Sequence, residues 1–563
     1  MPDDTVLLER HFDTAFAAPD GIQKLRELIL TLAMQGKLVP QDPNEESAQL
    51  LVQKIKTWKT EMVKNKVFLK STELASNRGG SEPYELPISW CWTRIGIICG
   101  SIVPNRDKPK SFSGGYPWVT LSNFDDKGIK LLSNHSGMGL SEQEVGEYNA
   151  RIMPKNSVLM SCVGRFGLVA VIDKDVVTNQ QIHGFVVPEQ LSSEYIAYVI
   201  KSQKEFLESS ATSTTISYLN KNRCESIPFP LPPLQEQRRI VAKIDRLMAR
   251  CDELEKLRAE RNQKRITIHT ATLNRLLNAK ESNDFSTAWR FITQHFGELY
   301  SVKENVAELR KAILQLAVMG KLVPQDPTDE PASELLRAIA AEKQQLVKEG
   351  KIKQPKPLPE IKPDKAPYEV PKGWEWVNLQ DLLAVVNDGD HQPPPKAESG
   401  IPFLVIGNLN TGRVSFNGCR FVPDDYYQSL DWGRKPDLND VLYTVTGSYG
   451  IPIHVDKNEK FCVQRHVAIL KSVKSSPIEY LTHLLKSNYA FNYANSVATG
   501  IAQKTVPLSG LRTMPIAIPP INEQRRIVAK IDQLMAHCNE LEKQIDAATK
   551  KQTTLLNAVM AQV

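Results

Sequence analysis

The chain has 563 residues, of which 41% are hydrophobic and 24% charged, and its net charge is +6. This ordinary globular balance excludes wholesale disorder, collagen and a mucin-like stalk, and the length predicts about three to four domains. There is no apolar run of the roughly 18 residues needed to cross a bilayer and no basic signal-peptide start, and the eight cysteines include no C-x-x-C pair. The sequence therefore predicts a soluble, cytoplasmic protein with reduced thiols and no membrane contact.

The N-terminal region, residues 1–80, is predicted to be helical. The apolar residues from Ile22 to Leu32 have the spacing of one helix face, and Gly36 follows where a left-handed C-terminal cap would stand. A second helix is predicted near residues 46–64.

Residues 81–227 are predicted to form a mixed α/β domain. The runs VLMSCV, LVAVID and GFVVP have the composition of strands, and residues 193–210 have the pattern of a helix. The tetrapeptide GRFG at 164–167 predicts a turn. The segment holds 14 Lys and Arg against 15 Asp and Glu, so charge alone does not indicate a nucleic-acid partner.

Residues 228–365 are predicted to be a central helical region and linker. A long helix is expected from Leu234 to Leu277, because a Pro-Pro pair precedes it and its apolar residues recur at spacings of four and three. The proline- and lysine-rich stretch 351–367 has the composition of an extended linker.

The chain repeats itself. The block LRELILTLAMQGKLVPQDP at 25–43 returns as LRKAILQLAVMGKLVPQDP at 309–327, with 14 of 19 positions identical. The block PPLQEQRRIVAKIDRLMARCDELEK at 232–256 returns as PPINEQRRIVAKIDQLMAHCNELEK at 519–543, with 20 of 25 identical. Repeats of this kind predict two tandem halves.

The second half is therefore predicted to follow the first. A helix is expected near 331–348, a second mixed α/β domain at 366–515 with a helix at 476–496, and a C-terminal helix at 516–563. The two α/β segments share a skeleton, as in NSVLMSCVGRFG and NDVLYTVTGSYG, but most of their polar residues differ. The two segments are therefore predicted to share one backbone fold and to differ in the polar side chains on its surface.

The long repeated helices carry a heptad seam, which predicts that they pair with each other as a coiled coil. The alternative is that each helix packs on its own domain. The first copy is eight residues longer beyond Lys256, so the two seams cannot stay in register throughout. The predicted seam residues are Ile240, Ile244, Leu247, Cys251 and Leu254 in the first copy and Ile527, Ile531, Leu534, Cys538 and Leu541 in the second.

Motifs for catalysis and metal binding are missing from the sequence. It contains no G-x-x-x-x-G-K-[ST], no H-E-x-x-H, no G-x-S-x-G and no Asn-Pro-Pro-aromatic tetrapeptide, and its ten histidines form no ligand cluster. It therefore predicts no catalytic residue, no metal site and no cofactor in this chain.

Polar residues near two glycine-bounded turns are candidate DNA contacts. Arg, Gln, Asn and His side chains can bond base edges in pairs, and Lys and Arg can reach phosphates. The alternative is that the glycines make turns and the amides satisfy the loop backbone. The candidates are Arg165, Gln180, Gln181, His183, Asn220, Lys221 and Arg223 in the first half and Ser448, Tyr449, Gln464, Arg465, His466, Gln503 and Lys504 in the second.

Two copies of PP-[LI]-x-EQRRIVAKID-x-LM, each closing a divergent segment, resemble the specificity subunit of type I restriction-modification systems. The block LRELIL…GKLVPQDP, with DEPASELLRAIAAEKQQL, resembles the IB branch of that family. The resemblance implies an α+β fold in which 81–227 and 366–515 are target-recognition domains, each reading half of a bipartite double-stranded DNA target. It also implies that the repeated helices separate these domains, pair as an antiparallel coiled coil and give a pseudo-twofold internal repeat.

The resemblance further implies a bacterial or archaeal phage-defence complex in which this chain carries sequence choice only. Two methyltransferase subunits would bring S-adenosylmethionine, and restriction or motor subunits would bring ATP and magnesium. Three rival functions stay open: a single-chain restriction or modification enzyme, a coiled-coil scaffold whose domains bind proteins, and a free-standing DNA-binding protein.

Overall fold

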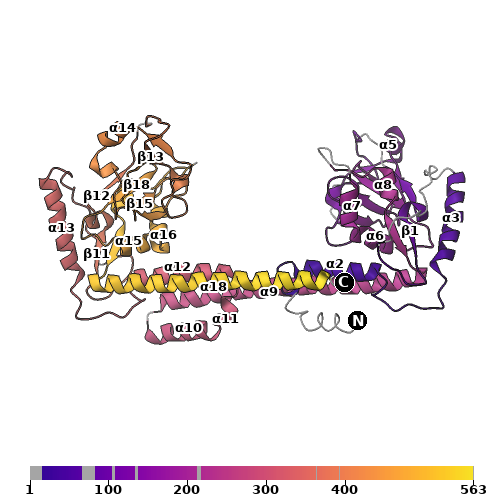
Figure 1. The fold of residues 1–563 in the computed structure, drawn as a ribbon, viewed down its shortest axis with the longest axis horizontal. Coiled ribbons are helices and arrows are strands. Elements are labelled where there is room, and N and C mark those ends of the chain that lie inside the picture. The colour runs from indigo at the N-terminus through magenta and orange to yellow at the C-terminus, as the bar shows by residue number, and fades with distance from the viewer. Residues whose placement is uncertain are drawn as a thin grey trace. The chain divides into compact units, whose positions relative to one another are not determined.

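The chain folds into two compact units. The computed structural model describes residues 16–65, 83–103, 108–132, 137–211, 217–279, 281–362, 364, 366–391, 394–501 and 503–561. The first unit comprises residues 1–260 and 548–563, and the second comprises residues 261–547 (Figure 1). Parts of the predicted N-terminal helical region, residues 1–15 and 66–80, lie outside the described residues.

The predicted N-terminal helices of the first unit are present as α2 (Gly21–Met34) and α3 (Ala48–Lys64). Gly36 ends α2 in the left-handed conformation at φ 71°, and the Lys37 N–H donates to the Leu32 carbonyl at 2.9 Å. A Cβ atom at Gly36 would lie 2.4 Å from Pro87 Cγ. The backbone conformation and the close approach both require glycine here.

The main sheet of the first unit has four antiparallel strands in the order β2-β9-β6-β7. A second sheet, β4-β3-β8-β5, contains the parallel pair β3 and β8, and β1 pairs with β10 as a ribbon. The strands are β1 (Cys91–Arg94), β2 (Gly100–Ile102), β3 (Tyr116–Val119), β4 (Gly139–Leu140), β5 (Ile152–Met153), β6 (Val158–Ser161), β7 (Val169–Val171), β8 (Val176–Thr178), β9 (Ile182–Val186) and β10 (Pro228–Leu231). Short helices complete the unit: α4 (Ile95–Ile98), η1 (Leu121–Asn123), α5 (Glu142–Glu147), α6 (Ser193–Ser202), α7 (Lys204–Ser210) and α8 (Lys221–Glu225).

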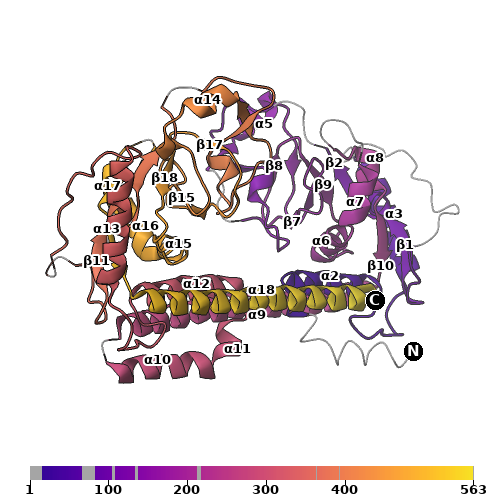
Figure 2. The same ribbon diagram turned by 60° about the vertical axis from the view of Figure 1, so that its left-hand side comes forward.

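The second unit has a main sheet of the same strand order, and its second sheet contains three strands in place of four. Its main antiparallel sheet has the order β12-β18-β15-β16, its second sheet has the order β14-β13-β17 with β13 and β17 parallel, and β11 pairs with β19. The strands are β11 (Glu375–Asn378), β12 (Val385–Asp388), β13 (Ile401–Leu404), β14 (Arg420–Val422), β15 (Val441–Thr444), β16 (Pro452–His454), β17 (Cys462–Val463), β18 (Val467–Lys471) and β19 (Pro515–Ile518). The helices are α10 (Ser282–Gln294), α11 (Phe296–Leu299), α12 (Lys303–Val318), α13 (Ala332–Lys348), η3 (Leu379–Leu382), η4 (Ile406–Asn408), α14 (Asp424–Ser429), η5 (Trp432–Arg434), α15 (Ile478–Leu485), α16 (Asn488–Val497) and α17 (Leu508–Arg512). Figure 2 shows β15 and β18 side by side in this sheet, with α15 and α16 close by.

The two long predicted helices are present as α9 (Leu234–Asn278), of 45 residues, and α18 (Ile521–Ala561), of 41. In the first unit, Ile240, Ile244 and Cys251 are buried in one core with residues of α2 and α6. Leu247 packs partly buried against the same core, whereas Leu254 is 49% exposed. This part of the seam therefore packs on its own domain, as the alternative interpretation predicted.

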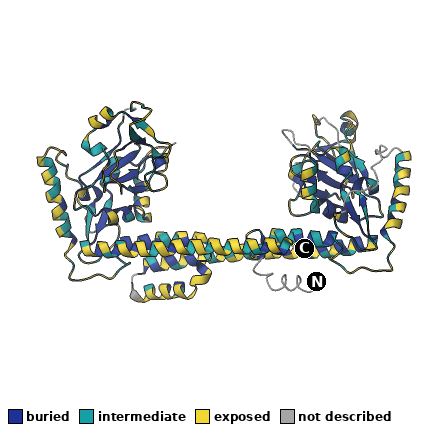
Figure 3. Cartoon of the chain, in the orientation of Figure 1, coloured by how far each residue is buried: buried dark blue, intermediate teal, exposed yellow. Residues whose placement is uncertain are grey.

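The second unit uses α18 in the same way, since Ile527, Ile531 and Cys538 lie in its core with residues of α12 and α15 and Leu534 and Leu541 pack against that core. The far end of each helix contributes to the other unit's core. Leu276 of α9 belongs to the core of the second unit, and Leu556 of α18 packs with Phe16 and Leu28 in the first. Figure 3 shows the buried residues concentrated on the strands of each unit and on one side of these helices.

Candidate nucleic-acid interface

In the first unit, three separate polar loops meet beyond the end of strand β6. The Cys162 N–H donates to the Gln181 carbonyl at 2.8 Å, which joins the β6 end to the loop before β9. The Gly164 N–H donates to the Ser217 carbonyl at 3.0 Å, and the Leu219 N–H donates to the Cys162 carbonyl at 2.9 Å. The predicted candidates of the first half therefore come from loops that lie against one another.

The second unit gathers its loops at the equivalent place, beyond the end of β15. The Val445 N–H donates to the His466 carbonyl at 3.0 Å, and the Gly447 N–H donates to the Lys504 carbonyl at 3.2 Å. β6 and β15 hold the same position in sheets of the same strand order. Two loop clusters therefore occupy matching positions in the two halves of the chain.

Arg165 lies on the exposed turn after β6, between two glycines with positive φ, Gly164 at 73° and Gly167 at 83°. Its side chain is 59% exposed, and one guanidinium nitrogen lies 2.6 Å from Asp126 Oδ1. An exposed ion pair of this kind contributes only about 0–1 kcal/mol. The guanidinium can therefore exchange this carboxylate for a phosphate or a base edge.

Gln181 is exposed in the loop between β8 and β9, and Gln180 is partly exposed beside it. The Asn179 side chain orders this loop, because its Oδ1 accepts the Gln181 N–H at 3.2 Å and its Nδ2 donates to Gln181 Oε1 at 3.1 Å. A side-chain amide that binds the backbone two residues on is typical of an ordered turn.

His183 does not lie on the surface, which corrects its prediction as a DNA contact. The residue is 2% exposed on β9, its Nε2 lies 2.7 Å from Ser101 Oγ, and its ring packs against Phe185. Burial, and secondarily the charge of Lys221, lower the pKa of His183 to about 3. The imidazole is therefore a neutral part of the core.

Asn220, Lys221 and Arg223 hold structural partners around helix α8. Asn220 Oδ1 accepts the Arg223 N–H at 3.0 Å and so caps the helix. Lys221 Nζ lies 3.6 Å from the buried Glu225 carboxylate, and the Arg223 guanidinium donates to the Ser210 carbonyl. Their contact with phosphate stays a prediction, and it would require these bonds to be exchanged.

In the second unit, one asparagine joins two of the candidate loops. Tyr449 Oη donates to Asn495 Oδ1 at 2.6 Å, and Lys504 Nζ donates to the same oxygen at 3.3 Å. Ser448 and Gln503, which precede Tyr449 and Lys504 in the chain, are exposed. Asn495 was not among the predicted candidates, because helix α16 lies between the motifs that the sequence singled out.

Arg465 is exposed before β18, and its Nε donates to His466 Nε2 at 3.4 Å. Burial and then the Arg465 charge lower the pKa of His466, so its neutral ring can accept this bond. Gln464 is fixed by its main chain, since its N–H donates to the Leu404 carbonyl at 3.1 Å. Its side chain is partly exposed.

Each unit also contains a buried contact that the sequence motifs did not predict. Trp90 Nε1 donates to Glu236 Oε2 at 3.0 Å, and Trp374 Nε1 donates to Glu523 Oε2 at 3.0 Å. Both carboxylates lie in the first turn of a long helix, where the helix dipole favours negative charge. Burial raises the pKa of Glu236. The contact ties the helix start to the residue before β1 or β11.

Arginines of the repeated blocks make a second set of matching contacts. Arg239 binds the Glu45 carboxylate, and Arg526 Nη2 lies 2.6 Å from Asp329 Oδ2. Two more matching ion pairs join helices. Arg26 of α2 lies 3.0 Å from Glu255 of α9, and Arg310 of α12 lies 3.1 Å from Glu542 of α18. The signal that could have found them is their presence, identical or chemically alike, in both copies of the repeat.

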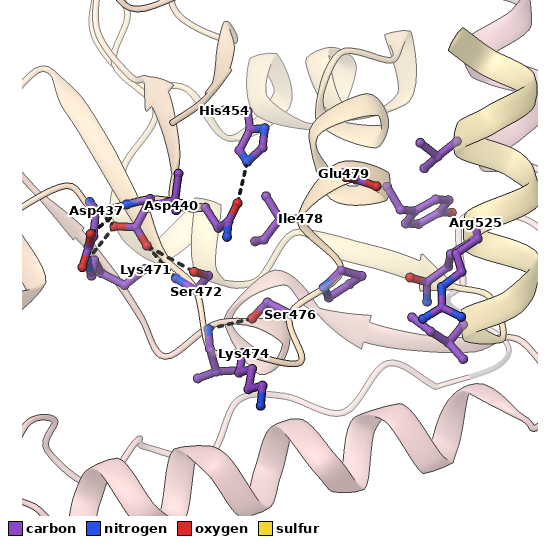
Figure 4. A pocket seen from close by; sticks show the side chains of 18 of the residues that line it. Asp437, Asp440, His454, Lys471, Ser472, Lys474, Ser476, Ile478, Glu479 and Arg525 are labelled. Atoms are coloured by element: carbon purple, nitrogen blue, oxygen red, sulfur yellow. Dashed lines mark hydrogen bonds and ion pairs between the residues drawn. The ribbon is translucent and has the colours of Figure 1, made fainter. Parts of the chain in front are cut away.

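A cavity of about 510 Å³ lies at the start of β15, at the other end of the strand from the polar loops (Figure 4). Its wall contains the ion pair of Lys471 and Asp440, with Nζ 2.6 Å from Oδ2 and both side chains 2% exposed. Lys471 also lies over the Trp432 ring, 4.6 Å from its centroid. These groups satisfy one another, so the cavity wall is structural.

Two further properties hold for the part of the chain that the structure describes. None of its helices combines the length and the apolar character needed to cross a membrane. None of its His, Cys, Asp and Glu side chains gather in threes that could hold a metal ion.

Comparison with known proteins gives consistent matches. The family model described as type I restriction modification DNA specificity domain matches residues 95–263 and 371–551. The specificity subunits of the type I restriction enzymes EcoAI and EcoEI of Escherichia coli are each 32% identical to this chain, covering 96% of it and 93% of each relative. A crystal structure of the HsdS subunit from Thermoanaerobacter tengcongensis matches with a TM-score of 0.42 and 18% identity, covering 85% of this chain and 98% of that one. Both loop clusters lie inside the segments that the family model matches.

Proposed function

This chain belongs to the family of type I restriction-modification DNA specificity subunits, and we propose that it selects the bipartite DNA target of such a complex. Residues 81–227 would read one half of the target, and residues 366–515 would read the other. The observation that carries the proposal is the gathering of three polar loops at one place on two sheets of the same strand order. The frame is repeated, whereas the side chains on the loops are not.

The chemistry of the loops supports base reading. Exposed Arg, Gln, Ser and Lys side chains offer donors and acceptors that can bond base edges in a groove. The two recognition segments are almost neutral, with 14 basic against 15 acidic residues in the first and 14 against 14 in the second. Phosphate contacts supply much of the affinity of DNA-binding proteins. The partner subunits are therefore expected to provide many of them.

We propose that the chain itself is not catalytic and acts in the cytoplasm of its host. Two modification subunits would carry S-adenosylmethionine, and restriction or motor subunits would carry ATP and magnesium. The sequence supports this division, because it holds no phosphate-loop, methyltransferase or metal-ligand motif. Incubation of the highly purified chain with DNA, S-adenosylmethionine and ATP should give neither methylation nor cleavage. Robust methylation by the single chain would contradict the proposal.

The proposed function is tested by exchanging one recognition segment. Replacement of residues 97–227 by the equivalent segment of a relative should change one half of the methylated motif and leave the other half intact. The measurement is single-molecule sequencing of DNA methylated by the assembled complex. A change in both halves together would refute independent reading, and methylation without any motif would refute target selection by this chain.

We also propose that α9 and α18 pair as an antiparallel coiled coil with a pseudo-twofold relation. The exchange of helix ends supports it, since α9 starts in the first unit's core and ends in the second's, whereas α18 does the reverse. Adding one heptad to both helices lengthens each by about 10 Å, or about three base pairs at roughly 3.4 Å each. The spacer between the half-sites should lengthen accordingly. An unchanged spacer in an assembled heptad variant would show that the helices do not set it.

Assignment to the IB branch remains a proposal that rests on the sequence of the repeated blocks. The rival function of a protein-binding scaffold predicts that the assembled complex keeps its motif when both loop clusters are altered. The rival function of a free-standing DNA-binding protein predicts that the isolated chain is specific without partners. The segment exchange and a binding assay of the isolated chain separate these alternatives.

A further inference from the structure

The first turn of helix α16 lies against the turn that carries Ser448 and Tyr449. The rings of Tyr449 and Phe491 are stacked, with centroids 5.9 Å apart and planes at 7°. A Cβ atom at Gly450, which has φ 92°, would lie 3.0 Å from Phe491 Cδ2. The turn is therefore built around this ring, although Phe491 is 46% exposed.

The stacked pair presents hydrocarbon beside polar loops. The Tyr449 hydroxyl is held by Asn495 at 2.6 Å, and phenylalanine has neither donor nor acceptor. An exposed aromatic ring costs free energy in water, and this one is fixed at its place by stacking and by the adjacent glycine. Its position among the candidate DNA contacts points to a partner with an apolar group.

The first unit has a different residue at the matching place. A Cβ atom at Gly167 would lie 3.3 Å from Cβ and Cγ of Lys204, the first residue of α7. Lys204 and Phe491 are 287 positions apart, which is also the offset of the second repeated block. The Lys204 side chain is 62% exposed, and its Nζ lies 3.9 Å from Glu208 Oε1. The same helix turn thus carries a cation in one half and an aromatic ring in the other.

Resting on the proposed function, we propose that this helix turn is a further DNA-reading element in each half of the chain. Phe491 contacts the 5-methyl group of a thymine in the half-site read by residues 366–515. Lys204 contacts the DNA backbone at the matching place of the other half-site.

The chemistry of the major groove leads to these two contacts. Among the base edges exposed there, the thymine methyl is the apolar group, and it is recognised by apolar side chains including phenylalanine. A ring held by stacking presents such a surface without ordering cost at binding. A lysine at the end of a flexible stem, by contrast, suits a phosphate oxygen, which fixes position without reading sequence.

The test measures binding of the assembled complex to DNA in which each thymine of the second half-site is replaced in turn by uracil. The wild-type complex should bind about fourfold more weakly when uracil replaces thymine at one position, which is the affinity that burying one methyl group contributes. Phe491→Ala should bind thymine and uracil equally at that position. Three results would overturn this inference and leave the proposed function standing. The wild-type complex could be sequence-specific but lose no affinity at any thymine-to-uracil change, or its half-site could contain no thymine. Wild type and Phe491→Ala could also lose the same affinity at that position. A wild-type complex without sequence preference would overturn the proposed function and this inference with it.

Leu438→Ala is the matched control for Phe491→Ala. Leu438 is 43% exposed in the same unit, but it precedes β15 and lies at the cavity end of the strand. The variant should keep wild-type discrimination between thymine and uracil. Lys204→Ala should weaken binding to all sequences alike and reduce the slope of log K against log salt by about one. An unchanged salt slope would overturn the backbone contact of Lys204.

Discussion

Removing one partner of the buried ion pair between Asp440 and Lys471 is expected to destabilise the second unit, whereas removing both partners is not. The first unit supplies the neutral replacement. Ser157 precedes β6 as Asp440 precedes β15, and Val186 follows Phe185 in β9 as Lys471 follows Leu470 in β18. Asp440→Ser with Lys471→Val therefore copies a pair that the same fold already accommodates.

The contacts left behind set the cost of each single change. In Asp440→Ser, a 2% exposed ammonium keeps only the Lys435 carbonyl at 3.0 Å and the Trp432 ring, so a loss of about 3–5 kcal/mol is expected. In Lys471→Val, the carboxylate keeps the N–H groups of Asp437 at 2.8 Å and Ser472 at 2.9 Å.

The lysine variant should lie at the lower end of that range, about 3 kcal/mol, for a second reason. Burial raises the pKa of Asp440 even with Lys471 beside it. Without the lysine the carboxyl group can take up a proton and lose its charge. The double variant should cost about 1 kcal/mol or less, because replacing both buried charges by fitting neutral groups is often neutral.

Amide hydrogen exchange is the suitable assay, because a chain of two units does not unfold in one step. The opening free energy of peptides covering β15 and β18 should fall in each single variant and recover in the double variant. Peptides covering β6 and β9 of the first unit serve as the internal reference. Losses below about 1 kcal/mol in both single variants, or a double variant as unstable as the worse single one, would refute the reasoning.

Further variants test the site and the frame. The pKa of buried His183 is lowered to about 3, so the stability that depends on its neutral form is fully present above the unfolded-state pKa of about 6.5. The free energy of unfolding of the first unit should therefore fall by about 2 kcal/mol between pH 7 and pH 5. In His183→Gln, hydrogen exchange should show a smaller fall over this pH range. Arg239→Ala should destabilise the first unit and Arg526→Ala the second, each by about 1–3 kcal/mol. If either variant destabilised both units equally, these ion pairs would not act locally. Arg165→Ala or Arg465→Ala should reduce DNA affinity of the assembled complex by about 1–3 kcal/mol at one motif position, and unchanged affinity and motif would exclude that contact.

Elements with strong local signals could be predicted from the sequence. The helical spacing and the capping glycine predicted α2 and its end at Gly36, and the Pro-Pro pair with its apolar periodicity predicted α9 from Leu234 onward. The repeat predicted that the second half would follow the first, and the main sheets of both units share one strand order. Such features depend on the conformational preferences of nearby residues, and the repeated sequence shows those preferences in both halves of the chain.

Contacts that depend on tertiary packing could not be predicted in the same way. A heptad seam states which side of a helix is apolar but not which element covers it, and Ile240 and Ile244 are covered by their own domain. His183 has the residue type of a base-reading side chain, but it lies on β9, where residues 182–185 are all buried. Because β9 lies between β2 and β6 in the main sheet, the position of the strand, rather than the residue type, decides this burial.

The division between repeated and divergent residues has a physical meaning in this fold. Glu236 and Arg239 of the second block reach Trp90 and Glu45, which lies just after the first block, and their copies make the same kinds of contact in the second unit. Retained residues are thus partners of one another, so a change in one would leave a buried or paired charge unsatisfied. The loop residues beyond β6 and β15 have no such partners in common, and exposed turns between glycines tolerate many side chains. A chain built this way can alter what its loops touch while the frame that presents them stays folded.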